Sequence, residues 1–404
     1  MYRGLREPRR ASLRQSARAS VSIAAVLVAA CAITSFSISA EAQDSRPWKP
    51  THGEGSAVNR LNVEINQATV GIVSGNLNGT YLSIAYDLSA VLDDGNKFRV
   101  LPIIGKGGGQ NIRDVRLLKG VDLGITQSVL LPYFQKTGEL GNLEGKLVYI
   151  AKLFNEEMHL IVRVDSGIES IEQLAGKKVN FSDIGSGTQL STIEIFSRLG
   201  IKAVEVNMGQ ADAFEALKKG EIAASVLIAG KPPGSIAKLK ASDGFRILPV
   251  PYAKPLQTDF LPATLTHEDY PNLIEAGRTV DTIAVGCVLF AYNWPKNTDR
   301  YERVEKFVNA FFPRLAEFQK PPRHPKWRET NLAATMPGWT RFEPAEQWLQ
   351  RNRPKPAAAE RKEFEEFLTA RGTGVLALTS DARPEEREKL FQEFLKWKEA
   401  RERR

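Results

Sequence analysis

The chain has 404 residues, of which 42% are hydrophobic and 25% charged, a composition typical of a globular protein with a sizeable core. Its formal net charge is +8, and half of this comes from residues 1–42, which hold six arginines and two glutamates. Nucleic-acid binding needs a concentrated basic face, and the small net charge that remains argues against a nucleic-acid partner.

Residues 1–42 are predicted to be an export signal. Arginines precede an apolar run from Val21 to Ile38, and Ala40-Glu41-Ala42 then forms a small-x-small cleavage site. A membrane-spanning helix fits less well, because the run contains polar residues and is short for a span. We therefore expect cleavage after Ala42 and a periplasmic location.

Two other signal types stay open for this segment. Arg9-Arg10 is typical of a twin-arginine signal, and Val28-Ala29-Ala30-Cys31 resembles a lipobox, which would make Cys31 a lipidated N-terminus. After cleavage at Ala42 only Cys287 is left, so the mature chain cannot form an internal disulfide. Cys287 lies in an apolar run and is predicted to be a small buried hydrophobe.

Beyond a linker predicted at residues 43–66, apolar runs alternate with helical patterns. This alternation predicts an α/β fold with mainly parallel sheets flanked by helices. Strands are predicted at Ala68–Val73, Phe98–Ile104, Val121–Thr126, Leu147–Leu153, Met158–Val164, Lys178–Phe181, Ala203–Val206, Ala223–Ile228, Phe245–Val250 and Thr282–Tyr292. Helices are predicted at Tyr81–Leu92, Asn111–Lys119, Ile171–Leu174, Thr188–Leu199, Ala211–Lys219 and Arg300–Phe318.

The order of these elements predicts two lobes, the second inserted into the first. Lobe I is expected at 67–161 and 283–350, and lobe II at 162–282, with a ligand cleft between them. The lobes are expected to close by a hinge near Val162 and Ile283.

Residues 351–404 are predicted to form a helical C-terminal extension. A Pro- and Ala-rich linker opens this segment, and aromatic residues follow among mixed charges. Mixed charge favours a solvated helix surface over a polybasic membrane patch, and the segment has no predicted function.

Several kinds of catalytic chemistry have no support in the sequence. The four histidines are scattered without metal-ligand spacing, so no metal site is predicted. Gly185-Ser186-Gly187 lacks the spacing of a nucleophile elbow, and no glycine–lysine pair has the spacing of an NTPase phosphate loop. No catalytic residue and no cofactor is predicted.

Three glycine-rich turns each lie between a predicted strand and a predicted helix. They are Gly75–Tyr81, Gly107–Asn111 and Gly185–Thr188. Glycine lets a ligand approach the backbone, and the unpaired N–H groups of a helix N-terminus attract carboxylates and phosphates. Any one such turn is also ordinary architecture, but three in one chain favour an anion-binding site.

The order of these turns resembles the TAXI family, the extracytoplasmic receptors of tripartite ATP-independent periplasmic (TRAP) transporters. The matching segments are Leu174–Val179 leading into Gly185-Ser186-Gly187-Thr188, Gly79-Thr80-Tyr81, and Gly120–Gln127. The resemblance covers roughly residues 70–348, and it is carried by the ordered set rather than by a single motif.

The resemblance implies a two-lobed, type II-like periplasmic binding protein without catalysis. It would close on a small anionic metabolite, such as an amino acid or a dicarboxylate, and its partners would be the membrane subunits of a transporter. The ligand-binding residues, some implied by the resemblance and some added from the turns, are Asn78, Thr80, Tyr81, Gln110, Asn111, Gln127, Ser186, Gly187, Thr188 and Gln189.

Gln110 and Val129 depart from the family pattern, which usually has serine and often aspartate there. Both lie near the expected pocket, so they bear on which ligand is bound. Arg163 and Lys231 are candidate cations, although each is more simply read as a solvated surface residue. The alternatives are a sensory periplasmic receptor, a binding protein of an ATP-driven importer, and, with less support, a periplasmic enzyme.

Overall fold

The computed structural model describes residues 57–77, 79–95 and 97–352, together with 363–364, 367, 393–394 and 398. The predicted signal peptide and nearly all of the predicted C-terminal extension lie outside the described residues. Among the helices that are described, none is both long and apolar enough to cross a membrane.

The described strands form one eleven-stranded sheet. They are β1 (Thr69–Val73), β2 (Arg99–Ile103), β3 (Leu123–Gln127), β4 (Leu147–Arg163), β5 (Lys178–Asn180), β6 (Val204–Val206), β7 (Ala224–Ala229), β8 (Phe245–Leu248), β9 (Leu261–Thr266), β10 (Thr279–Tyr292) and β11 (Thr340–Arg341). The order along the sheet is β2-β1-β3-β10-β4-β7-β5-β6, with β8 and β11 beside β4 and β9 beside β10. The outer groups β2-β1-β3 and β7-β5-β6 pair in parallel, whereas β4 and β10 are antiparallel to each other.

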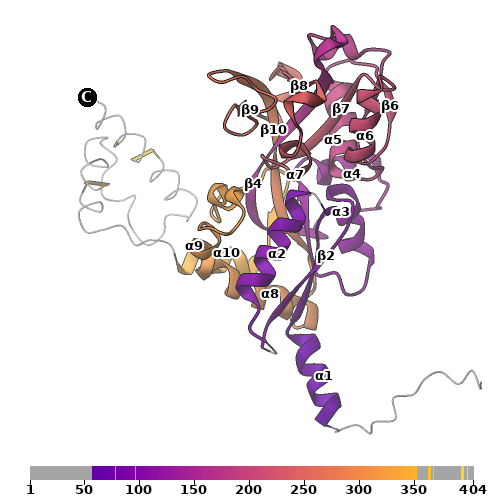
Figure 1. The fold of residues 1–404 in the computed structure, drawn as a ribbon. Coiled ribbons are helices and arrows are strands. Elements are labelled where there is room, and N and C mark those ends of the chain that lie inside the picture. The colour runs from indigo at the N-terminus through magenta and orange to yellow at the C-terminus, as the bar shows by residue number, and fades with distance from the viewer. Residues whose placement is uncertain are drawn as a thin grey trace, which may run out of the picture. The chain divides into compact units, whose positions relative to one another are not determined.

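Strands β4 and β10 run side by side through the sheet and connect two lobes (Figure 1). Strand β4 pairs with β10 as far as Glu157, and from Glu157 onward it pairs with β7 and β8. Strand β10 pairs with β9 up to Ala284 and with β3 from Cys287. This change of partners separates lobe I, around β1 to β3, from lobe II, around β5 to β9. The predicted hinge residues Val162 and Ile283 lie on the same two strands.

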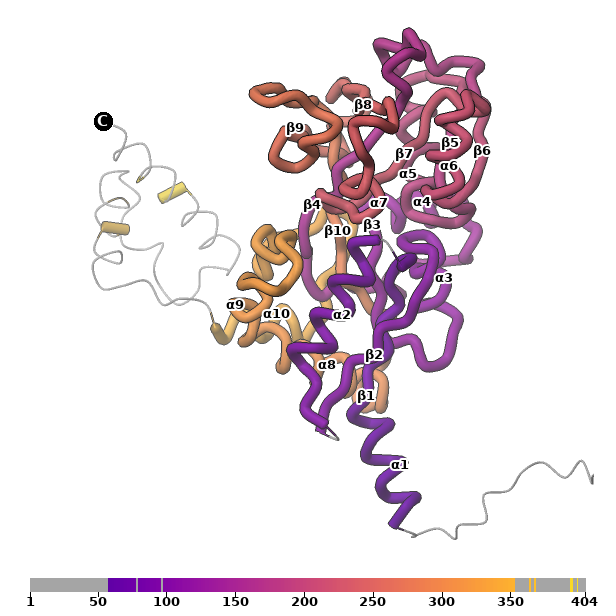
Figure 2. Tube along the Cα trace, viewed as in Figure 1, coloured from indigo at the N-terminus to yellow at the C-terminus, as the bar shows by residue number. Residues whose placement is uncertain are grey.

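Within the described residues between 57 and 352, ten α-helices accompany the strands. They are α1 (Ala57–Gln67), α2 (Thr80–Leu92), α3 (Gly108–Leu117), α4 (Leu130–Thr137), α5 (Gly187–Arg198), α6 (Gln210–Lys218), α7 (Gly234–Ala237), α8 (Asp299–Phe311), α9 (Leu315–Phe318) and α10 (Glu343–Arg351). Helices α2, α8, α9 and α10 lie together in lobe I (Figure 2), where Leu88 and Phe307 belong to one apolar core. A second core contains Leu130 of α4 and Leu190 of α5, so it joins the two lobes on one side.

Two predicted boundaries are corrected by the structure. The two strands expected at Leu147–Leu153 and Met158–Val164 are one strand, β4, because Glu156 and Glu157 are buried with hydrogen-bonding partners and do not interrupt it. The single helix expected at Arg300–Phe318 is broken. Helix α8 ends at Phe311, and a 3₁₀ turn containing Pro313 separates it from α9, because proline lacks the N–H that continues a helix.

Other elements differ from the sequence-based expectation. The second half of the predicted linker is the helix α1, none of whose residues is buried, so no burial pattern marks it as part of a core. Residues 171–174 form a short 3₁₀ helix. Helix α4 and strand β9 were not predicted.

Candidate functional site

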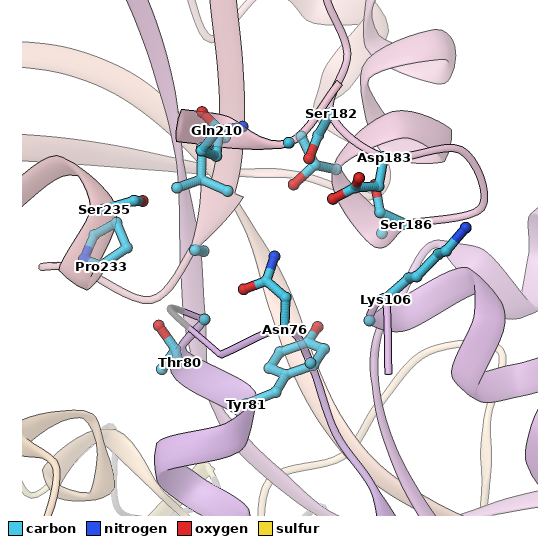
Figure 3. Close-up of a pocket in the computed structure, with 18 of the residues that line it drawn as sticks. Asn76, Thr80, Tyr81, Lys106, Ser182, Asp183, Ser186, Gln210, Pro233 and Ser235 are labelled. Atoms are coloured by element: carbon cyan, nitrogen blue, oxygen red, sulfur yellow. The ribbon is translucent and has the colours of Figure 1, made fainter. Parts of the chain in front are cut away.

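A cavity of about 540 Å³ lies between the lobes. Lobe I contributes the turns before α2 and α3 together with Gln127 and Glu156, and lobe II contributes the turns before α5, α6 and α7. Figure 3 shows Asn76, Thr80 and Tyr81 across the pocket from Ser182 and Gln210. The cavity has the size of a small-molecule site.

The N-termini of four helices of eight residues or more meet at this cavity. Its lining includes Thr80 and Tyr81 of α2, Gly108 of α3, Gly187 and Thr188 of α5, and Gln210 with the following residues of α6. The first N–H groups of a helix lack partners within that helix, and the helix dipole places partial positive charge there. Four such termini around one space make it favourable for an anion.

Three of these four helices start without a side-chain cap among the described residues. The N-cap positions of α2, α3 and α6 are Gly79, Gly107 and Gly209, which have no side chain to accept from the first N–H groups. Only α5 is capped, by the Ser186 oxygen, which accepts from the Gln189 N–H at 3.1 Å. The glycine caps therefore leave backbone donors for a ligand.

Six of the ten residues named from the sequence line the cavity: Thr80, Tyr81, Gln127, Ser186, Gly187 and Thr188. Two of their hydroxyls are already used by the fold. The Thr80 hydroxyl donates to the Gly230 carbonyl at 2.9 Å, from lobe I to lobe II. The Thr188 hydroxyl donates to the Ile228 carbonyl at 3.3 Å and accepts from the Ile228 N–H at 3.1 Å. These two threonines build the pocket wall through hydrogen bonds to the backbone.

Three of the named residues do not line the cavity, and their side chains support the turns from behind. Asn111 is fully buried and donates to the carbonyls of Ser74 and Ile125 at 2.7 and 2.6 Å. The Gln110 side-chain oxygen accepts from the Lys106 N–H, and that of Gln189 accepts from the Gly185 N–H. The structure does not place these three side chains in the cavity lining, and their contact with a ligand stays a prediction. Asn78 lies outside the described residues.

Among the lining residues that were absent from the sequence-based set, three polar ones bear on the site: Asn76, Gln210 and Glu156. Asn76 points toward the middle of the pocket (Figure 3), and its side chain makes no hydrogen bond with any described residue. Gln210 belongs to the fourth helix start, but its amide is bonded to Val226 and Ser225. Glu156 lies within an apolar strand, where the sequence showed only a polar interruption. Asn76 was visible as part of the first glycine turn.

Glu156 is buried at the cavity wall, with 2% of its surface exposed. The Tyr81 hydroxyl donates to Oε2 of Glu156 at 2.7 Å, and the Gln127 side chain also hydrogen-bonds it. Burial raises the pKa of Glu156 to about 8, and these hydrogen bonds oppose the rise without cancelling it. Burial likewise raises the pKa of the Tyr81 hydroxyl well above its usual value, so it stays a donor.

The remaining charges of the lining are balanced. The lining contains Lys106 and Lys238 together with Asp183 and Asp212, and all four lie at exposed or half-buried positions. The two cations considered from the sequence are engaged elsewhere, since Lys231 pairs with Asp269 at 2.8 Å and Arg163 pairs with Asp165 at 2.8 Å. The described part of the chain brings together no cluster of histidine, cysteine and acidic residues fit to hold a metal ion. The described lining therefore offers a ligand four helix N-termini and no excess of cations.

The model of the NMT1-like family matches residues 72–334, more than half of the chain. Among solved structures, the chain is similar to one described as a periplasmic transporter, with 13% identity over 70% of this chain and 92% of that one and a TM-score of 0.43. It is also similar to the periplasmic aliphatic sulphonate binding protein SsuA of Escherichia coli (17% identity, 76% and 88% covered, TM-score 0.36). A third is an ABC transporter periplasmic binding protein of Brucella ovis with glutathione bound (14%, 67% and 77% covered, TM-score 0.37). Identities this low assign no ligand to the present chain.

Proposed function

The chain belongs to the NMT1-like family, and we propose that it is an exported receptor that captures a small anionic metabolite in the periplasm. The ligand class is an amino acid or a dicarboxylate. The receiving partner is the membrane part of a TRAP-type transporter, as the resemblance to the TAXI family implies. No nucleic acid, cofactor or metal enters this function.

One observation carries the proposal. Four helix N-termini from two lobes surround one cavity, and three of them begin at glycine caps that leave backbone N–H groups free of side-chain partners among the described residues. Because the lysines and aspartates of the lining balance each other, these backbone donors are the groups that favour an anion over a cation.

The hydrogen bonds made by the lining hydroxyls support a role in binding rather than in catalysis. The hydroxyls of Thr80 and Thr188 are hydrogen-bonded to backbone groups, and that of Tyr81 donates to Glu156. The hydroxyls of Thr80 and Thr188 are therefore not paired with a base that could activate them as nucleophiles. The pocket holds groups that recognise a ligand.

We propose that capture closes two lobes on the ligand, lobe I at residues 67–161 and 283–350 and lobe II at 162–282. The bend would occur where β4 and β10 exchange partners, at Glu157 and Ala284. Hinges of this kind need only a few residues to absorb the change in backbone angles.

A thermal-shift panel tests the function. The exported protein is melted with succinate, L-glutamate and the uncharged analogue succinamide, each over a concentration series. A ligand at about 100 times its Kd raises the free energy of unfolding by about 2.7 kcal/mol, so a binding carboxylate is expected to shift the melting temperature clearly. Succinamide matches succinate in size without its charge and is expected to shift it little. No response to any carboxylate, or an equal response to succinamide, would contradict anion capture.

A further inference from the structure

Glu156 occupies a special place in the sheet. It lies next to Glu157, the residue at which β4 leaves β10 and begins to pair with β7, and it pairs with Val285 of β10. Its side chain is 2% exposed and lies at the wall of the ligand cavity. A carboxyl group is thus held at the crossing between the lobes, facing the site proposed for an anion.

Hydrogen bonds from lobe I hold this carboxyl group, and one of its partners is in turn bonded from lobe II. Tyr81 of α2 donates to it at 2.7 Å, and Gln127 of β3 also bonds it. The oxygen of the Gln127 side chain accepts in turn from the hydroxyl of Ser191, which belongs to α5 in lobe II. The carboxyl group of Glu156 therefore has a fixed orientation, set by α2 and β3 directly and by α5 through Gln127.

No described lysine, arginine or histidine forms an ion pair with Glu156. The charge of Lys326 lowers the pKa of Glu156, but this lysine forms ion pairs with Glu157 at 2.6 Å and with Glu329 at 2.7 Å. On β10, Glu156 interacts electrostatically with Cys287, whose thiol stays neutral because burial raises its pKa. Glu157, on the same strand, adds negative charge that disfavours ionisation of Glu156.

The charges across the cavity do not supply a counter-ion either. Lys106 and Lys238 share the lining with Asp183 and Asp212, which balance them. An ionised Glu156 would leave a buried charge without a partner and would repel an anionic ligand in the same space. A protonated Glu156 removes both penalties and adds a donor.

We propose that Glu156 is a ligand-binding residue that stays protonated in the complex and donates a hydrogen bond from its carboxyl group to an oxygen of the bound anion. The proton remains on Glu156, and no covalent bond is made or broken. The inference rests on the proposed capture of an anion and narrows it to ligands that present an oxygen acceptor at this wall. A hydrogen bond between a carboxylic acid and a carboxylate is among the stronger ones in proteins.

The protonation state agrees with this role. Burial raises the pKa of Glu156 to about 8, so most of the free protein carries the proton at neutral pH. Above about pH 8 the free protein loses this proton and must regain it when the anion binds. Affinity for the anion is therefore expected to be nearly constant below that pH and to fall about tenfold per pH unit above it.

The first test needs no ligand. Infrared difference spectra of the exported protein between about pH 7 and pH 10 are compared for the wild type and Glu156→Gln. The wild type is expected to show a protonated carboxyl group that disappears through about pH 8 and is missing in the variant. A wild type without that band at neutral pH would overturn the inference, whatever the fate of anion capture.

The second test measures the Kd of succinate by calorimetry over the same pH range, since both succinate carboxylates stay ionised there. Glu156→Gln keeps a hydrogen-bond donor that cannot ionise, so its affinity is expected to stay level while that of the wild type falls. Asp183→Asn is the matched control, which removes a charge of the lining and should keep the wild-type pH dependence.

The outcomes separate the two proposals. If succinate binds with the same pH dependence in the wild type and in Glu156→Gln, Glu156 does not donate to the ligand although capture stands. If neither succinate nor any other carboxylate of the panel binds at any pH, capture itself fails, and the inference fails with it.

Discussion

The backbone N–H of Gln110, in the first turn of α3, donates a 2.8 Å hydrogen bond to the carbonyl oxygen of Gly185, before α5. This bond joins lobe I to lobe II at the edge of the ligand cavity. The backbones are close because glycines meet there, and a Cβ on Gly108 would lie 3.2 Å from Cα of Gly187. The glycines of these turns therefore allow the close contact between the lobes.

We expect Gly109→Ala to damage this contact. The added Cβ would lie 2.5 Å from the Gly185 oxygen and 2.5 Å from Cδ1 of Leu190, so the lobes must move apart. The loss of stability is expected to be about 1–3 kcal/mol, as for other overpacked sites, with weaker carboxylate binding. Urea unfolding measures it, and Gly209→Ala is the control because nothing lies within 4 Å of its Cβ. Equal stability of the two variants would contradict the contact.

Asn76→Ala is expected to weaken carboxylate binding roughly tenfold, the loss of one hydrogen bond to a charged group. The Asn76 side chain is exposed in the cavity and bonds no other described residue, so stability should stay within about 0.5 kcal/mol of the wild type. Calorimetry with succinate gives the affinity. Asn142→Ala, in a loop away from the cavity, is the matched control, and similar affinities for both variants would remove Asn76 from the site.

Lys326→Met is expected to destabilise the protein by about 3–5 kcal/mol. Lys326 is 2% exposed and pairs with Glu157, so its loss leaves a buried carboxylate without its cation. Adding Glu157→Gln should recover part of the loss, because the uncompensated charge is then gone. Urea unfolding gives the values. Lys296→Met, which breaks the exposed pair with Glu343, should cost less than about 1 kcal/mol.

The stability of the wild type relative to Glu156→Gln is expected to fall as pH rises. The pKa of Glu156 is raised from its ordinary 4.5 to about 8, so the folded state holds the proton more tightly than the unfolded state. The contribution of this bound proton to the free energy of unfolding is fully present below about pH 4.5 and is lost as pH rises through about 8. The difference should decline by roughly 1.4 kcal/mol per pH unit between these limits. Parallel curves from urea unfolding at pH 5 to 8 would contradict a raised pKa.

The periodic parts of the fold were predictable from the sequence. Apolar runs located nine of the described strands to within a few residues, and the glycine turns marked the starts of α2, α3 and α5, three of the four helix termini at the cavity. Helix α4 was missed because its pattern is short and contains Pro132. Strand β9 was missed because only one of its residues is buried, so no clear alternation marks it.

The roles of individual site residues were harder to predict, because they depend on which partner each polar group finds in three dimensions. Asn111 and Gln189 have the donors that a ligand would use, yet the Asn111 amide donates to backbone carbonyls and the Gln189 amide donates to the Glu205 carboxylate. Glu156 and Glu157 are adjacent in the sequence, but alternation along β4 directs one to the cavity and the other to Lys326. Only the packed structure separates these two fates.

The central claim is that backbone N–H groups at helix starts hold the anion, and a crystal structure of the exported protein with the carboxylate selected by the thermal-shift panel tests it most directly. We predict that the carboxylate oxygens lie within hydrogen-bonding distance of N–H groups in the first turns of α2, α3, α5 or α6. A carboxylate held instead by Lys106 or Lys238, or bound outside this cavity, would contradict the account.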